Sequence, residues 1–200
     1  MILEAIILTV ITAATPLVVA ALGELVTERS GVLNLGVEGM MIMGAVGAFA
    51  VAQMTGNPYL GLLAGIAVGA LFSLLFGFLT LTLVTNQVAT GLALTILGLG
   101  ASGMIGETWV GVPGIKLQAI YIPGLSDIPV IGPILFHQDI VFYLSIALLI
   151  GVNWFLFRSR TGLMLRAIGD NHGSAHALGI DVRRVRYLSV MFGGACAGLA

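Results

Sequence analysis

Residues 60–84 read LGLLAGIAVGALFSLLFGFLTLTLV, a stretch without a charged side chain. A helix needs about 20 apolar residues to cross the hydrocarbon core of a bilayer, and this stretch is longer than that. Small residues that recur four apart share one face of a helix and let another helix approach closely. The stretch therefore predicts a membrane-spanning helix with a packing face, which serves contacts within one protomer or, alternatively, a homodimer. The face comprises Gly61, Gly65, Gly69, Ser73 and Gly77.

The rest of the chain repeats this apolar character. Hydrophobic residues make up 58% of the 200 residues and charged residues only 8%, against roughly a quarter charged in an average soluble domain. So few charges cannot cover a soluble protein, whereas a lipid-facing exterior needs none. We predict an all-α, polytopic membrane protein in a single domain, 1–200, with five complete transmembrane helices and a truncated sixth. The expected segments are 2–22, 36–54, 60–84, 88–105, 140–157 and a sixth that begins near Tyr187 and is cut off at Ala200.

The arginines predict the orientation, because loops rich in Lys and Arg stay in the cytoplasm. The loop 158–186 is predicted to be cytoplasmic, and the loop 107–138, which has one lysine and no arginine, to be external. Counting back through single spans places 85–87 and 23–35 inside and 55–59 outside. The basic residues of the cytoplasmic loop are Arg158, Arg160, Arg166, Arg183, Arg184 and Arg186.

Two groups of polar residues interrupt the apolar pattern, and polar groups at membrane depth are costly and often functional. Asn34 and Glu38 lie in GVLNLGVEGMM at the start of the second segment. This stretch is either a turn with an acid at a helix N-terminus or a broken helix that lines a translocation path. Asn86 and Gln87 either form an interfacial loop or hydrogen-bond a substrate. These four residues are the candidate substrate-pathway residues.

The loop 158–186 contains a candidate short helix. Ser174 is placed to cap a helix through residues 175–178, and Gly179 is placed to end it. A helix this short is marginal on its own, so it requires a partner surface. The alternative, a basic anchor at anionic lipid, explains the arginines but not a capped helix with a glycine stop.

No catalytic, metal or cofactor site is predicted. The sequence has no glycine-rich phosphate loop, no paired carboxylates within a span and no nucleophile elbow. His172 and His176 are four apart, but no cysteine or acid completes a metal-ligand set. The lone Cys196 lies in an apolar stretch and is expected to pack between helices. The chain is therefore predicted not to be an enzyme.

Three stretches, in collinear order, resemble a known family: GVLNLGVEGMM (31–41), IPGLSDIPVIGPILF (122–136) and RAIGDNHGSAHALGIDVRRV (166–185). They are similar to the permease subunits of bacterial ATP-binding cassette (ABC) importers of the branched-chain amino acid/ribose type, and most similar to simple-sugar and nucleoside permeases. The first resembles the family's signature at its second helix. The second resembles the external loop of the nucleoside-like branch, and the third the cytoplasmic loop that contacts the ATPase.

The resemblance implies a transport subunit of a bacterial cell membrane, in contact with lipid and not with nucleic acid. An external binding lipoprotein would deliver nucleosides or simple sugars to two permease subunits, identical or different. ATP would be bound by partner ATPase subunits, and residues 175–179 would be the coupling helix in an ATPase groove. The ATPase-coupling residues so implied are Arg166, Gly169, Asp170, Ala175, Ala177, Leu178, Gly179, Arg183 and Arg184.

Three alternatives are weighed against this importer. A branched-chain amino acid permease would keep the same architecture. A secondary transporter would need ion-linked carboxylates at mid-membrane depth, whereas Glu38 and Asp139 lie near segment ends. A structural membrane subunit without a substrate would not need the ordered loop at 166–186.

Overall fold

The computed structural model describes residues 2–120 and 132–200, and every regular element in these two ranges is helical. Five stretches are long and apolar enough to cross a membrane: Ala5–Arg29, Val37–Thr55, Pro58–Thr82, Gln87–Trp109 and Ile140–Arg158. The predicted all-α fold with five spans is therefore confirmed. The α-helices are α1 (Ile2–Arg29), α2 (Val37–Thr55), α3 (Pro58–Gly77), α4 (Gln87–Gly106), α5 (Ile140–Arg158), α6 (Arg160–Asp170), α7 (His172–Ala177) and α8 (Val182–Leu199). Three short helical turns lie between these helices: η1 (Phe78–Thr82), η2 (Glu107–Trp109) and η3 (Gly132–Phe136).

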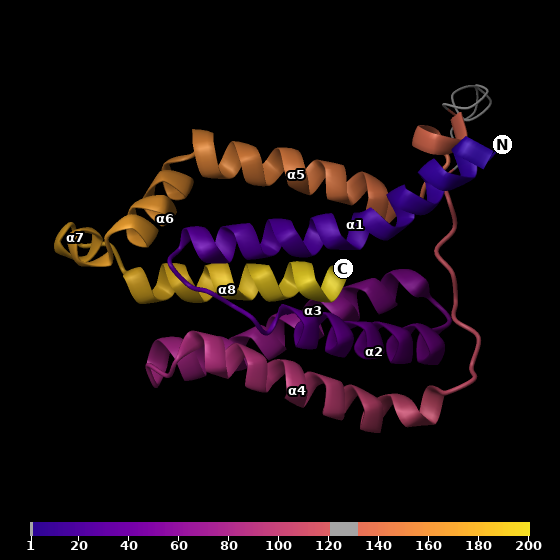
Figure 1. Ribbon diagram of the computed structural model, residues 1–200, viewed down its shortest axis with the longest axis horizontal. Helices are drawn as coiled ribbons and strands as arrows, with labels where there is room; N and C mark the ends of the chain where they lie inside the picture. The colour runs from indigo at the N-terminus through magenta and orange to yellow at the C-terminus, as the bar shows by residue number, and fades with distance from the viewer. Residues whose placement is uncertain (1, 121–131) are drawn as a thin grey trace.

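The spanning helices run along the long axis of the molecule (Figure 1). The helices α6 and α7 lie at one end of this bundle, where α1 and α5 also end and α4 and α8 begin (Figure 1). The chain segments at this end are therefore those that the orientation count assigns to one side of the membrane. Which side that end faces stays a prediction.

Polar caps start most of these helices. A side-chain oxygen of the residue before the helix accepts a hydrogen bond from a backbone N–H in the first turn, which satisfies a donor that has no partner within the helix. Such caps begin α3, α4, α5, α6, α7 and α8 at Asn57, Asn86, Asp139, Ser159, Asn171 and Asp181.

The core of the bundle lies around α8, which packs against α1, α2 and α3. The small-residue face of α3 is buried against α8 and α2 of the same chain. A side chain added at Gly69 would overlap the carbonyl oxygen of Gly194, and one at Gly198 would overlap that of Gly65. The buried Cys196 meets α1 at Gly23. Backbone contact at these positions replaces side-chain interdigitation, as in other close-packed membrane helices.

Several predicted boundaries are wrong. The first helix was expected to end at Leu22, but α1 continues through the partly polar residues 24–29, and the chain leaves the helix only before Gly31 at φ +80°. The sixth segment was expected to begin near Tyr187, but Asp181 caps α8 five residues earlier. The loop 158–186 was expected to hold one short helix, but it also contains α6. Of the loop 107–138, which was predicted to be external, residues 121–131 lie outside the described part of the chain, and most of the motif at 122–136 with them.

Candidate functional site

Residues 30–36 join α1 to α2 without regular structure, and we call them the α1–α2 connection. Figure 1 shows this connection running from the end of the bundle toward its middle, where α2 begins. Its residues alternate between buried and exposed, with Ser30, Val32 and Asn34 inside. Irregular backbone at membrane depth is tolerated only where its polar groups find partners within the protein.

Side chains from two helices supply those partners. Oε1 of Glu24 on α1 accepts a hydrogen bond from the N–H of Asn34 at 3.1 Å. Oε1 of Gln87 on α4 accepts one from the N–H of Leu33 at 2.8 Å, and Thr95 of α4 donates to the carbonyl of Leu35 at 3.1 Å. The connection is therefore held in one conformation by contacts with α1 and α4.

The connection also stabilises itself. Oδ1 of Asn34 accepts the N–H of Gly36 at 2.9 Å, two residues ahead, as asparagine does in tight turns. The same side chain is 2% exposed, and its amide nitrogen lies 3.5 Å from the sulfur of Met40. Asn34 thus fixes the turn that leads into α2.

The carboxylate of Glu24 is only half satisfied. While Oε1 accepts from Asn34, Oε2 is buried and has no hydrogen-bond partner in the described ranges. Buried polar atoms without a partner are uncommon and costly. Glu24 is therefore a polar group held at some cost beside the irregular connection.

The four predicted pathway residues do not form one cluster. Gln87 contacts the α1–α2 connection through the N–H of Leu33, and Asn34 lies within the connection and bonds the N–H of Gly36. Asn86 caps α4 through the N–H of Ala89, and Glu38 is exposed in the first turn of α2. Two of the four, Asn34 and Gln87, thus belong to or contact the α1–α2 connection.

The candidate short helix is α7, and its predicted cap is wrong. The N-cap is Asn171, whose Oδ1 accepts the N–H of Ser174 at 3.0 Å, so the helix begins three residues earlier than expected. Gly179 follows the helix at φ +80°, the left-handed conformation that glycine adopts at low cost, and its N–H donates to the carbonyl of His176. Leu178, between helix and glycine, is 81% exposed.

The nine predicted coupling residues are distributed over α6, α7 and α8. Arg166 of α6 stacks over the ring of Phe157, 5.2 Å from its centroid. Ala175 is buried on the inner face of α7, whereas Ala177 and Leu178 are exposed. The predicted residues of α8 are Arg183, which donates to Thr82 of η1, and Arg184, whose backbone N–H donates to Asp181. Gly169 and Asp170 end α6 in exposed positions.

A cleft of about 760 Å³ separates α7 from the start of α4. Its lining mixes polar and apolar side chains from η1, α4, α7 and α8, including Thr80, Gln87, His172, Asp181 and Arg186. Gln87 both lines this cleft and accepts the hydrogen bond from Leu33 of the α1–α2 connection.

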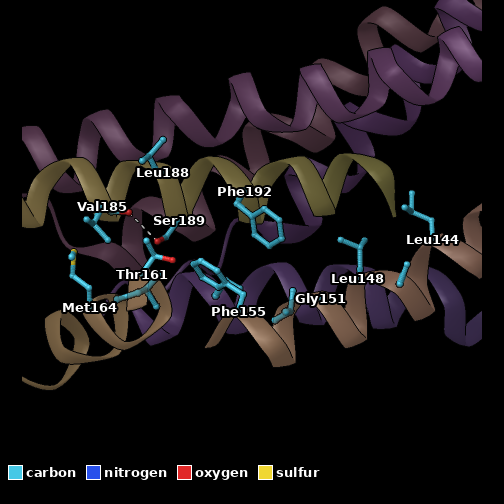
Figure 2. Close-up of a pocket in the computed structure, with 14 residues that line it drawn as sticks. Leu144, Leu148, Gly151, Phe155, Thr161, Met164, Val185, Leu188, Ser189 and Phe192 are labelled. Atoms are coloured by element: carbon cyan, nitrogen blue, oxygen red, sulfur yellow. Dashed lines mark hydrogen bonds between the residues drawn. The ribbon is translucent and has the colours of Figure 1, made fainter. Parts of the chain in front are cut away.

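A second cavity, of about 610 Å³, lies between α5, α6 and α8 (Figure 2). Phe155 and Phe192 point into it from opposite walls (Figure 2). Its polar side chains are Thr161 and Ser189, and the hydroxyl of Ser189 already donates to the carbonyl of Val185 at 2.9 Å. This lining offers few hydrogen bonds to a polar solute, so we do not assign it to the translocation path.

Sequence reasoning missed three side chains that hold the connection. Glu24 and Thr95 were not among the candidate residues, and Arg186 was predicted only as a basic residue of the loop 158–186. Each lies far in sequence from the backbone group that it contacts, except Glu24. An acid within an apolar run was the one signal that could have drawn attention to Glu24.

Comparison with known proteins covers nearly the whole chain. The profile of a family described as "branched-chain amino acid transport system / permease component" matches residues 6–200. A putative glucose ABC transporter permease protein of Haloferax volcanii is 42% identical over 95% of this chain and 59% of its own length. The guanosine ABC transporter permease protein NupQ of Bacillus subtilis is 38% identical over 93% of this chain and 62% of its own length.

A third relative is named for a different class of substrate. A probable branched-chain amino acid transport permease protein of Methanocaldococcus jannaschii is 31% identical over 92% of this chain and 60% of its own length. The chain thus spans about six tenths of the length of these curated relatives. No solved structure matches the chain.

Proposed function

The chain belongs to the branched-chain amino acid transport system permease family, and on that premise we propose that it is the membrane-spanning permease of an ATP-driven importer for nucleosides or simple sugars. The similarity to permeases named for glucose and guanosine, over more than nine tenths of the chain, carries this proposal. An external binding protein delivers the solute, a second permease subunit completes the path, and partner ATPase subunits bind and hydrolyse ATP. The protein is a multi-pass membrane protein, and we place it in the cell membrane.

The site for the ATPase is α7 with its flanks. A six-residue helix that exposes Leu178 at its C-terminal end suits insertion into a groove of a partner subunit. Arg183 and Arg184 at the start of α8 are exposed near it and would face acidic groups of that subunit. This end of the bundle then faces the cytoplasm, in agreement with the arginine count.

The translocation path passes the α1–α2 connection. Broken backbone at membrane depth is a recurring feature of transporter binding sites, because it exposes polar groups that regular helices conceal. Here Gln87 of α4 brings an amide group beside the connection, whereas the buried amide of Asn34 is already bonded to Gly36 and shapes the turn. An amide such as that of Gln87 suits the hydroxyls of a sugar or ribose.

A branched-chain amino acid permease is the second candidate. The family description and the relative from Methanocaldococcus jannaschii favour it. Both candidates share the architecture and the ATPase contact, and they differ only in the solute.

Uptake into proteoliposomes tests the proposal. The intact permease is reconstituted with its ATPase and binding protein, and accumulation of labelled guanosine, glucose and leucine is measured with and without ATP. We expect ATP-dependent accumulation of guanosine or glucose, and none with an ATPase variant that cannot hydrolyse ATP. Accumulation of leucine alone would support the second candidate. Uptake that follows an ion gradient without ATP would contradict both.

A further inference from the structure

The helix α7 has few direct contacts with the bundle. It packs against its chain neighbours α6 and α8, and the cleft of about 760 Å³ separates it from η1 and the start of α4. A displacement of α7 by a partner protein would therefore reach the rest of the molecule through α6 and α8.

The α6 route ends at the last residue of α1. Gly169, one turn from α7, lies so close to the backbone that a side chain added there would overlap the carbonyl oxygen of Arg29. Its Cα also stands 3.3 Å from the position that a Cβ on Gly31 would occupy. Because the contact is backbone against backbone, movement of α6 cannot be absorbed by a side-chain rotation.

The α8 route ends at the same place. Nε of Arg186 donates a hydrogen bond to the carbonyl oxygen of Ser30 at 3.0 Å, over 156 positions of sequence. Its second guanidinium nitrogen lies 3.0 Å from the position of a Cβ on Gly31. The Ser30 side chain is fully buried, so this arginine is anchored to the interior and not to solvent.

Both helices that flank α7 therefore contact residues 29–31, where the α1–α2 connection begins. From there the chain leads directly to Leu33 and Asn34, whose N–H groups are held by Gln87 and Glu24. The segment at 29–31 is the shared point of contact between the two routes and the candidate path.

We infer that residues 29–31 receive the displacement of α7 and pass it to the α1–α2 connection, with Arg186 as the positioning residue. This inference rests on the proposed function, because it takes α7 as the ATPase contact. Arg186 acts through the backbone of Ser30 and need not touch the solute. Because its guanidinium is rigid and planar, Arg186 makes the connection move with α8. A lysine at this position is more flexible and would transmit the movement of α8 less well.

Two measurements on Arg186→Met in the reconstituted transporter test the inference. The first is the amount of solute imported per ATP hydrolysed, which we expect to fall about tenfold, the effect of one hydrogen bond to a charged donor. Arg186→Lys keeps a donor and should lose less. Arg160→Met is the matched control, since it removes an exposed arginine of the same loop and should leave the ratio unchanged.

The second measurement distinguishes the inference about Arg186 from the proposed ATPase contact at α7. Spin labels are attached singly at Ser174→Cys in α7 and at Leu33→Cys in the connection, both exposed, with Cys196→Ala. We expect ATP to change the spectrum of both labels in the transporter with Arg186. In Arg186→Met the change at Ser174 should persist and the change at Leu33 should be lost.

An unaltered response at Leu33 in Arg186→Met would overturn the inference and leave the proposed function standing. No response at Ser174 with Arg186 present would overturn the proposed ATPase contact, and the inference with it. If Arg186→Met fails to assemble with the ATPase, Arg186→Lys carries the same comparison. A normal import ratio and a normal Leu33 response in that variant, with the same result in Gly169→Ala, would also overturn the inference.

Discussion

The backbone N–H of Asn34 donates a hydrogen bond of 3.1 Å to Oε1 of Glu24, which lies ten positions earlier in the chain, near the end of α1. This contact joins the last turns of α1 to the irregular connection that follows it. A carboxylate in this position is otherwise hard to explain, because its other oxygen has no partner among the described residues. The contact gives the acid a structural purpose beside the candidate path.

Replacing Glu24 should therefore weaken the fold in a way that depends on the acceptor. We expect Glu24→Ala to lower the free energy of unfolding by about 1–3 kcal/mol, because the N–H of Asn34 loses its partner. Glu24→Gln keeps an acceptor and should cost less. Thermal unfolding of the purified permease in detergent measures the difference. Glu28→Ala, an exposed acid one turn later, is the control, and an equal loss there would refute the role of Glu24.

The close approach of α3 and α8 predicts a contrast between two glycines. Gly194→Ala places a methyl group against Ser73, so we expect a loss of about 1–3 kcal/mol from overpacking. Gly100→Ala has nothing within 4 Å and should be neutral or stabilise α4 by up to about 1 kcal/mol. Unfolding midpoints of the two variants test this. Equal midpoints would show that the α3–α8 contact tolerates a side chain.

Gly179 should be intolerant of larger residues because of its backbone and its position. A non-glycine residue at φ +80° costs about 1 kcal/mol or more, and an arginine adds bulk where α7 is proposed to enter a partner groove. We expect Gly179→Arg to abolish ATP-dependent uptake by the intact transporter while membrane insertion stays normal. Gly173→Ala, within α7 and at ordinary contact distance from Asn171, is the control. Normal uptake with Gly179→Arg would reject α7 as the coupling helix.

The orientation of the bundle can be tested at α7 itself. A cysteine at the exposed Ser174, with Cys196 replaced, should react with a membrane-impermeant thiol reagent only from the cytoplasmic side. The arginines of 158–186 are the physical reason, since basic loops stay inside. Labelling in intact cells tests access from outside, and labelling in inverted vesicles tests access from the cytoplasmic side. Reaction in intact cells would reverse the assigned sidedness.

The fold was largely predictable because length and apolarity suffice to mark a membrane span. The errors arose where polar residues continue a helix. Glu24, Glu28 and Arg29 were interpreted as a loop, yet α1 passes through them. Similarly, the arginines at the start of α8 hid a helix that Asp181 caps, a signal that the sequence did contain.

The short helices were only partly predictable. The buried residues of α6, Gly162, Leu165 and Ile168, recur three apart, a helical period that was overlooked within a loop judged by charge. For α7 the glycine stop was placed correctly, but Ser174 was taken as the cap although Asn171 has the same capability. Local rules allow both, and the structure decides between them.

The candidate site was the least predictable part. Asn34 and Gln87 were singled out as polar residues in apolar surroundings, but nothing in the sequence says that Gln87 bonds the backbone N–H of Leu33, next to Asn34. The hydrogen bond from Arg186 to Ser30 depends on how α8 packs beside α1. Such long-range contacts follow from the assembled bundle and not from any local pattern.

The central place of α8 has a consequence for how the protein is made. The helices α1, α2 and α3 are synthesised before α8, so Gly69 of α3, which packs against Gly194 and Gly198, lacks its partner until α8 emerges. The contact between α2 and α3 can form first, and α8 then adds contacts with α1, α2 and α3. A chain arrested before Val182 would keep the cluster formed by α1, α5 and α6 but would lack every contact that α8 makes with α1, α2 and α3.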